Sequence, residues 1–293
     1  MQSALLYATT VLTGGLVWFA TKFQLGIVPP EVSLIYRFGA AALMLVGFAA
    51  SLGLPLKFCI AVHVRLALFG ALVFSGNFAL LYAAIRNLTS GLVAITFSTS
   101  VLLNIAFGAI FLGRKIEVRI VAAALLGLCG LTLIFHQELV LLDFADARTL
   151  AVIHALGATA LFSLGNIVSA RLQAERIPAL VSTAYAMGYG ALLLILYAIV
   201  TGKPFVFDSS QSYVLSLLYL TIFGSAIGYG TYFTLLGRIG SERAAYTTVL
   251  VPALALGVST LFERFVWTET AIAGVMLILG GNIVILTKRN SMD

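Results

Sequence analysis

The sequence predicts an all-α polytopic membrane protein with ten transmembrane helices, arranged as two inverted five-helix repeats with both termini cytoplasmic. Three observations support this fold class: the composition is 61% hydrophobic and 10% charged, long apolar stretches recur along the chain, and Lys and Arg gather on alternate loops. Soluble domains carry about 25% charged residues. This chain carries far fewer, so much of its molecular surface must face lipid. Stretches such as 40–50 and 192–200 are apolar on every side, which favours helices over barrel strands.

Ten segments have about the 20 apolar residues that a helix needs to cross the hydrocarbon core. They are residues 3–24, 31–53, 65–86, 91–113, 117–136, 149–170, 178–201, 212–236, 243–263 and 268–287. Little chain remains between these segments, so we expect no soluble domain. The connections have room only for short loops or a surface helix.

Basic residues predict which face holds the termini. Eleven Lys and Arg residues fall on the side of the N-terminus and five on the other side, and Arg37 lies within a predicted helix. Cytoplasmic loops carry the excess of Lys and Arg, so both termini are expected to be cytoplasmic. The same bias accounts for the net charge of +6, and we expect no nucleic-acid partner.

The two halves of the chain resemble each other. Over the last three helices of each half, residues match at a constant separation of 151 positions, as Ser90 matches Ser241 and Val101 matches Pro252. We therefore predict a first repeat, an outer linker and a second repeat at residues 1–137, 138–147 and 148–293. Because five is odd, the second repeat enters the membrane from the opposite face. Inverted repeats are typical of secondary transporters, whose substrate site lies near the midplane where the halves meet.

Short motifs add a resemblance to a known group. Trp18 lies in the first predicted helix, Pro30 and Arg37-Phe38 in the second, and Pro252 in the ninth. With the ten spans and two repeats, this pattern resembles the drug/metabolite transporter superfamily with EamA-type repeats, and is nearest in general look to aromatic amino-acid exporters of the YddG type. The resemblance implies alternating access to a cavity formed by helices 1–4 and 6–9, with the fifth and tenth as outer scaffold.

The sequence also departs from the common pattern of that superfamily. Many relatives carry a Gly-Glu pair where the fourth and ninth helices end, whereas here those places read Gly113-Arg114 and Arg264-Phe265, and Glu263 lies two residues early. The proline of the ninth helix has no counterpart in the first half, where Val101 stands instead. The role of that acid in relatives therefore does not transfer to this chain.

Polar side chains within the predicted spans are the first candidates for substrate binding, because they are costly in lipid and usually face the bundle interior. Asn77 lies in the third span, Ser163 and Asn166 in the sixth, and Ser98 and Thr99 in the fourth. Each also has a structural alternative. The amides can join helices by hydrogen bonds, and the hydroxyls can bond carbonyls one turn back in their own helix.

Aromatic side chains are the second group of candidates. We expect Trp18, Phe78, Tyr82, Phe97 and Tyr229 to line the interior. Ligand pockets are mostly apolar and aromatic with a few fixed polar groups, so such a wall would suit a planar, ring-bearing substrate. The alternative for Trp and Tyr is a belt at the membrane surface.

Arg37 and Pro252 stand apart from both groups. Arg37 lies six residues into the second predicted helix, roughly 9 Å at 1.5 Å per residue. It could bind a substrate carboxylate, extend to the surface or serve as a structural or gating group, and the resemblance favours the last of these. Pro252 removes one backbone hydrogen bond, and a carbonyl freed there could face the cavity.

The remaining expectations concern chemistry and partners. No Asp or Glu lies near the middle of a predicted span, so we predict facilitated transport without a proton relay. We expect no metal, cofactor or enzymatic activity. The partners expected are a small-molecule substrate and the lipid bilayer, with the chain acting as a monomer. We predict an exporter of small metabolites, amino acids first and aromatic ones among them, in a bacterial inner membrane. A drug, nucleotide-sugar or lipid carrier, and more remotely a membrane-embedded enzyme, remain alternatives.

Overall fold

The computed structural model describes residues 2–85, 87–88, 90–136, 147–262 and 267–286, and within these ranges its regular secondary structure is helical. The helices of the first half are α1 (Gln2–Gly15), α2 (Val17–Lys22), α3 (Pro30–Ser51), α4 (Ile60–Gly70), η1 (Ala71–Gly76), α5 (Asn77–Ile85), α6 (Ser90–Ser98), α7 (Ser100–Leu112) and α8 (Val118–Ile134). Those of the second half are α10 (Ala147–Ala174), α11 (Ala179–Val200), α12 (Gln211–Tyr219), η2 (Leu220–Ile227), α13 (Gly228–Ile239), α14 (Ser241–Ala245), α15 (Thr247–Phe262) and α16 (Glu269–Leu286).

Each of the ten predicted segments coincides with one helix or with a run of consecutive helices. Six of them are long and apolar enough to cross a membrane, and these are Pro30–Ser51, Ile60–Ile85, Ile95–Leu112, Thr149–Ala174, Ala179–Val200 and Gln211–Ile239. Helices α8 and α16 are apolar but shorter. The first and ninth segments are each divided by a break, after Gly15 and after Ala245. The protein is therefore a multi-pass membrane protein.

Two π-helical stretches occupy matching places in the two halves. η1 joins α4 to α5 in the third predicted segment, and η2 joins α12 to α13 in the eighth. Such wide turns are rare and are frequent at functional sites. The apolar pattern of the sequence predicts a helix at η1 and η2. It does not predict the wider π-helical turn, because a continuous apolar run fits an α-helix and a π-helix equally well.

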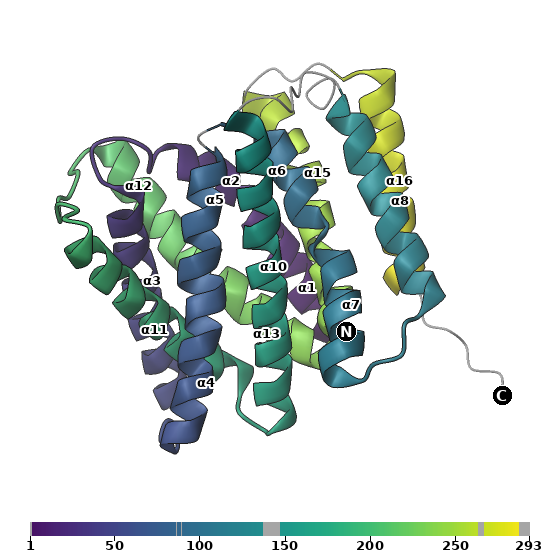
Figure 1. Ribbon diagram of the computed structural model, residues 1–293. Coiled ribbons are helices and arrows are strands. Elements are labelled where there is room, and N and C mark those ends of the chain that lie inside the picture. The colour runs from purple at the N-terminus through teal and green to yellow at the C-terminus, as the bar shows by residue number, and fades with distance from the viewer. Residues whose placement is uncertain (1, 86, 89, 137–146, 263–266, 287–293) are drawn as a thin grey trace.

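The packing of the two halves is reciprocal. The first helix of the first half, α1, packs against α13 and α15 of the second half, while α10, which opens the second half, packs against α5 and α7 of the first. At one edge of the bundle α8 packs along α16, and away from it α3 packs along α11 (Figure 1). The interior between the halves is thus bounded by helices of both.

The edge pair of α8 and α16 is in backbone contact. A Cβ built on Gly130 would lie 2.5 Å from the carbonyl oxygen of Gly274, and one built on Gly274 would meet the carbonyl of Gly130. Small residues let membrane helices approach this closely. The contact fixes α8 and α16 to each other at the edge of the bundle (Figure 1).

Candidate functional site

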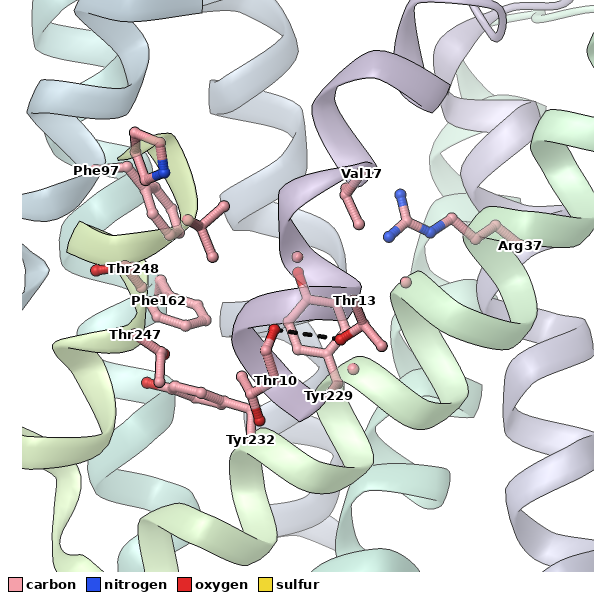
Figure 2. Close-up of a pocket in the computed structure, with 15 residues that line it drawn as sticks. Thr10, Thr13, Val17, Arg37, Phe97, Phe162, Tyr229, Tyr232, Thr247 and Thr248 are labelled. Atoms are coloured by element: carbon pink, nitrogen blue, oxygen red, sulfur yellow. Dashed lines mark hydrogen bonds between the residues drawn. The ribbon is translucent and has the colours of Figure 1, made fainter. Parts of the chain in front are cut away.

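A cavity of about 140 Å³ lies between the two halves, and Figure 2 shows the side chains that line it. The lining residues are Thr10, Thr13, Gly14, Val17, Arg37, Phe97, Phe162, Gly224, Gly228, Tyr229, Tyr232, Thr247, Thr248, Val251 and Pro252. They come from α1, α2, α3 and α6 of the first half and from α10, η2, α13 and α15 of the second. The space is enough for several water molecules.

Arg37 supplies the positive charge of this cavity. Its side chain is 4% exposed and its Nε donates a hydrogen bond of 2.7 Å to Oγ of the buried Ser225 on η2. The guanidinium carbon lies 5.3 Å from the ring centre of Phe38 and 5.9 Å from that of Phe78. Cation–π contacts of this kind hold a guanidinium in place. Within the described part of the chain, no carboxylate pairs with Arg37.

Threonine hydroxyls form a second part of the wall. Thr13 donates to the carbonyl of Thr9 at 2.8 Å, Thr247 to that of Ala244 at 2.8 Å, and Thr248 to that of Ala245 at 2.7 Å. A hydroxyl has one hydrogen and two lone pairs. Because each hydrogen is used on a backbone carbonyl three or four residues earlier in the chain, these threonines offer the cavity hydrogen-bond acceptors.

Aromatic rings form the third part. Phe97 of α6 packs against Phe162 of α10 with ring centres 5.0 Å apart, and Phe162 packs against Tyr232 of α13 at 5.6 Å. Tyr229 packs edge-on against the buried Phe74 at 5.1 Å. The rings thus come from both halves and give the cavity an apolar, flat-sided wall.

Two glycines bring the charged and hydroxyl parts of the wall together. A Cβ built on Gly224 would lie 3.3 Å from Nη2 of Arg37, and one built on Gly228 would lie 3.3 Å from Oγ1 of Thr13. Residues four apart on a helix are roughly 5–6 Å apart, so Arg37 and Thr13 face neighbouring points of the cavity. Figure 2 shows the guanidinium directed from α3 toward Val17, one turn from Thr13.

The structure brings three of the sequence-predicted site residues to the cavity, namely Arg37, Phe97 and Tyr229. Phe78 packs behind the guanidinium of Arg37, with its ring centre 5.0 Å from that of Phe38. Tyr82 is partly buried and packs against the hydrophobic core. The side chain of Trp18 lies outside the described residues.

The predicted polar residues of the interior mostly bond to the protein itself. Nδ2 of Asn77 donates to the carbonyl of Ala158 at 2.7 Å, which ties α5 to α10. Ser98 donates to the carbonyl of Thr248 at 3.3 Å across the halves, and Thr99 donates to the carbonyl of Thr96 at 2.6 Å. In a regular helix the carbonyl of Thr248 would accept a hydrogen bond from the N–H of residue 252. Pro252 has no N–H, so that carbonyl is left for Ser98.

A cluster of buried polar atoms has no such partner. Oγ of Ser163, Oδ1 of Asn166 and the hydroxyl of Tyr232 are buried without a hydrogen bond in the described protein. The other amide atom of Asn166, Nδ2, donates to Oδ1 of Asn104 at 3.2 Å. Buried polar atoms normally find partners. Tyr232 lines the cavity and its hydroxyl interacts with the nearby Asn166 side chain, so this polar pair borders the space open to a bound molecule.

The cavity also contains threonines that the sequence analysis did not single out. Thr10, Thr13 and Val17 follow one another at helical spacing and so share one face, which was the available signal. Thr247 and Thr248 lie one turn before Pro252. These residues were missed because a threonine inside a helix usually satisfies its own backbone, which hides any further role.

The fold and the cavity define a class: a helical membrane carrier whose two halves enclose a small, mostly apolar chamber that contains one arginine and several hydroxyl groups. Comparison with known proteins gives the family. The EamA-like transporter family matches residues 1–136 and 149–287, so the chain belongs to this family of the drug/metabolite transporter superfamily. It is therefore a transporter and not an enzyme.

Three relatives are similar to this chain over at least nine-tenths of their length. The chain is 24% identical to a probable amino-acid metabolite efflux pump of Escherichia coli, covering 96% of this chain and 93% of the relative. It is 25% identical to a protein of the same description from Salmonella typhimurium, covering 92% and 90%. It is 26% identical to the uncharacterized transporter YvbV of Bacillus subtilis, covering 98% and 92%. A solved crystal structure matches with a TM-score of 0.80 at 20% identity, covering 97% of this chain and 96% of that one, which supports the fold.

Proposed function

We propose that this transporter exports small amino-acid metabolites, aromatic amino acids among them, and that the cavity around Arg37 is its substrate site. The observation that carries the proposal is a buried arginine that faces a cavity and pairs with no carboxylate in the described protein. A buried charge without a partner is costly, and a substrate carboxylate would supply that partner in a charge-assisted contact. The similar proteins of Escherichia coli and Salmonella typhimurium are named probable amino-acid metabolite efflux pumps, which supports this substrate class.

The rest of the wall suits the other groups of an amino acid. The lone pairs of Thr13, Thr247 and Thr248 can accept hydrogen bonds from an ammonium group, and Thr13 faces the cavity close to Arg37. The rings of Phe97 and Phe162 can pack against a planar side chain. A zwitterion with an aromatic side chain therefore finds a matching group at each part of the cavity.

We further propose how the chain sits and moves. The halves 1–137 and 148–293, joined by the linker 138–147, are inverted repeats of five membrane-spanning helices in a bacterial inner membrane, with both termini cytoplasmic. The reciprocal packing of α1 and α10 on the opposite halves supports this arrangement. The halves rock about the cavity so that it opens to one face at a time. Transport is facilitated and needs neither a proton relay nor a second copy of the chain.

Efflux from proteoliposomes tests the substrate class. Vesicles containing the purified protein are loaded with one labelled amino acid at a time, and efflux is followed with and without a pH gradient. We expect phenylalanine to leave without a gradient, and we expect phenethylamine, which lacks the carboxylate, to compete poorly. If no amino acid escapes, the substrate class is wrong. A strict requirement for the gradient would overturn facilitated transport.

The variant Arg37→Gln tests the carboxylate contact. Hydrogen bonds to charged groups contribute about 1.5–3 kcal/mol, so its KM should rise at least about tenfold. Arg238→Gln is the matched control, because Arg238 bonds Gln2 at the exposed surface, 3.1 Å away, and does not line the cavity. Equal KM values for Arg37→Gln and the parent would remove Arg37 from the site.

A further inference from the structure

The ion pairs of the described protein share one property. Arg65 with Glu175, Arg114 with Glu242, and Arg243 with Glu117 each join the first half to the second. All three lie at the end of the bundle where α7 ends and α8 begins, which is the lower end in Figure 1. Exposed ion pairs contribute little to stability. Their placement across the boundary between the halves therefore calls for another explanation.

Two of these pairs surround a second hollow between the halves. A cavity of about 580 Å³ is lined by Arg114, Lys115 and Glu117 on the first half and by Glu242 and Arg243 on the second, together with Ile105, Ile120, Ile239 and Gly240. The loop after α7 supplies one side and α14 the other. The hollow lies on the side of α7 away from Ser100, and therefore between the central cavity and the lower end of the bundle.

The Arg114–Glu242 pair occupies space that two glycines leave open. Nη1 of Arg114 lies 2.7 Å from Oε2 of Glu242 and also donates to Oγ of Ser241 at 3.3 Å. Gly240 has a φ of +91°, which disfavours a side chain, and a Cβ there would lie 3.0 Å from both Arg114 and Glu242. A Cβ on Gly108 would strike the other carboxylate oxygen, Oε1.

Within the residues that the structure describes, only one of the two carboxylate oxygens of Glu242 has a hydrogen-bond partner. Its side chain is 13% exposed, and Oε1 is buried without a hydrogen-bond partner in the described protein. Such an atom gains bonds to water when the interface separates, which lowers the cost of opening. This pair is therefore suited to break and re-form, unlike the backbone contact between α8 and α16 at Gly130 and Gly274.

A second row of bonds crosses between the halves nearer the centre. Ser98 donates to the carbonyl of Thr248 at 3.3 Å, and Ser100 lies 3.2 Å from the hydroxyl of Thr248. These bonds flank the break between α6 and α7 at Thr99. Thr248 also lines the central cavity. A path from that cavity to the lower end that runs between the halves would separate this row and the ion pairs.

We propose that the Arg114–Glu242 and Arg243–Glu117 pairs, with the Ser98 and Ser100 contacts to Thr248, form a gate that closes the central cavity toward the face carrying residue 57. The inference rests on the alternating access proposed above. It assigns to Arg114 and Glu242 a role in closing the space between the halves. Closing the gate brings opposite charges of the two halves together, and opening it returns them to water.

Side-specific labelling tests the gate without any substrate, so its outcome is independent of whether amino acids are transported. In the full chain with Cys59→Ser and Cys129→Ser, a single reporter Thr13→Cys reports access to the central cavity. A membrane-impermeant maleimide is added to vesicles of each orientation. Arg114→Gln and Glu242→Gln should each raise the labelling rate from the face of residue 57 about fivefold, which corresponds to about 1 kcal/mol, without raising it from the other face.

Two control variants distinguish opening of this gate from a general weakening of the contacts between the halves. The exchanged pair Arg114→Glu with Glu242→Arg should restore labelling to within about twofold of the parent. Arg65→Gln, which breaks an ion pair between the halves that does not line the hollow, should leave it unchanged. Rates in both Gln variants like those of the parent, equal increases from both faces, or an equal effect of Arg65→Gln would each overturn the proposal.

A reducible crosslink provides a second measurement. Cysteines in place of Glu117 and Arg243 are joined by a bifunctional methanethiosulfonate, because the contact between the native side chains is made by their far ends and a direct disulfide needs closer backbones. Labelling of Thr13→Cys from the face of residue 57 should then fall, and return after reduction. Undiminished labelling of protein shown by mass spectrometry to be crosslinked would contradict the gate, even if the Gln variants failed to fold.

Discussion

Ser225→Ala isolates the positioning of Arg37 from its charge. Ser225 is fully buried on η2 and accepts the Nε hydrogen bond of Arg37 at 2.7 Å. A hydrogen bond to a charged group contributes about 1.5–3 kcal/mol. In Ser225→Ala the guanidinium keeps its charge and the hydrogen-bond donors of its two Nη groups, and loses only the contact that orients it. We therefore use the lower value, about 1.5 kcal/mol, for the loss of substrate binding. We therefore expect KM for a carboxylate substrate to rise about tenfold, with a smaller change in the maximal rate.

The assay for this variant is initial-rate efflux from proteoliposomes over a range of internal substrate concentrations. Ser33→Ala is the matched control, because Ser33 lies on the same helix as Arg37, is buried, and bonds the hydroxyl of Tyr213 at 2.9 Å instead. Both variants lose one buried hydrogen bond, so they should lose similar stability while only Ser225→Ala changes KM. A KM for folded Ser225→Ala within twofold of the parent would refute the role given to this contact.

Two further substitutions distinguish residues of the site from residues of the fold. Tyr232→Phe removes a buried hydroxyl that lines the cavity beside Asn166, so the free energy of unfolding should change by no more than about 1.5 kcal/mol while KM increases about threefold to tenfold, as for one neutral hydrogen bond; unchanged KM would show that the hydroxyl does not meet substrate. Asn77→Ala removes the 2.7 Å bond to the Ala158 carbonyl and should lower the unfolding free energy by about 0.6–2 kcal/mol with KM unchanged; a tenfold rise in KM at unchanged stability would place Asn77 in the site instead.

The positions of the helices followed from the sequence because lipid imposes a length and an apolar composition on each span. The interruptions did not follow in the same way. The breaks at Leu16 and Tyr246 and the wide turns of η1 and η2 are such interruptions. Glycines do lie at three of these places, since Gly14 and Gly15 precede the break at Leu16, Gly76 ends η1 and Gly224 lies in η2. Glycines are also spread through the other spans, so their presence did not single out these interruptions. Pro252 was the exception, since its missing N–H pointed to a freed carbonyl, and the Thr248 carbonyl four residues earlier is bonded by Ser98.

The candidate site was predictable in kind more than in detail. The sequence singled out Arg37, Phe97 and Tyr229, which line the cavity, because a charge and rings inside lipid are conspicuous. It could not show that Asn77 bonds Ala158 across helices, since the facing helix is fixed only by tertiary packing. The same limit applies to Arg114, whose partner Glu242 lies 128 residues away.

The arrangement of two oppositely oriented halves is the claim on which the rest depends, and it can be measured directly. The loop at Lys57, between α3 and α4, and the loop at Asp208, between α11 and α12, follow the second predicted span of each half. Single cysteines at these positions, in the chain without Cys59 and Cys129, are labelled with an impermeant maleimide in vesicles of known orientation. Inverted halves require labelling of the two cysteines from opposite faces. Labelling of both from one face would contradict the account.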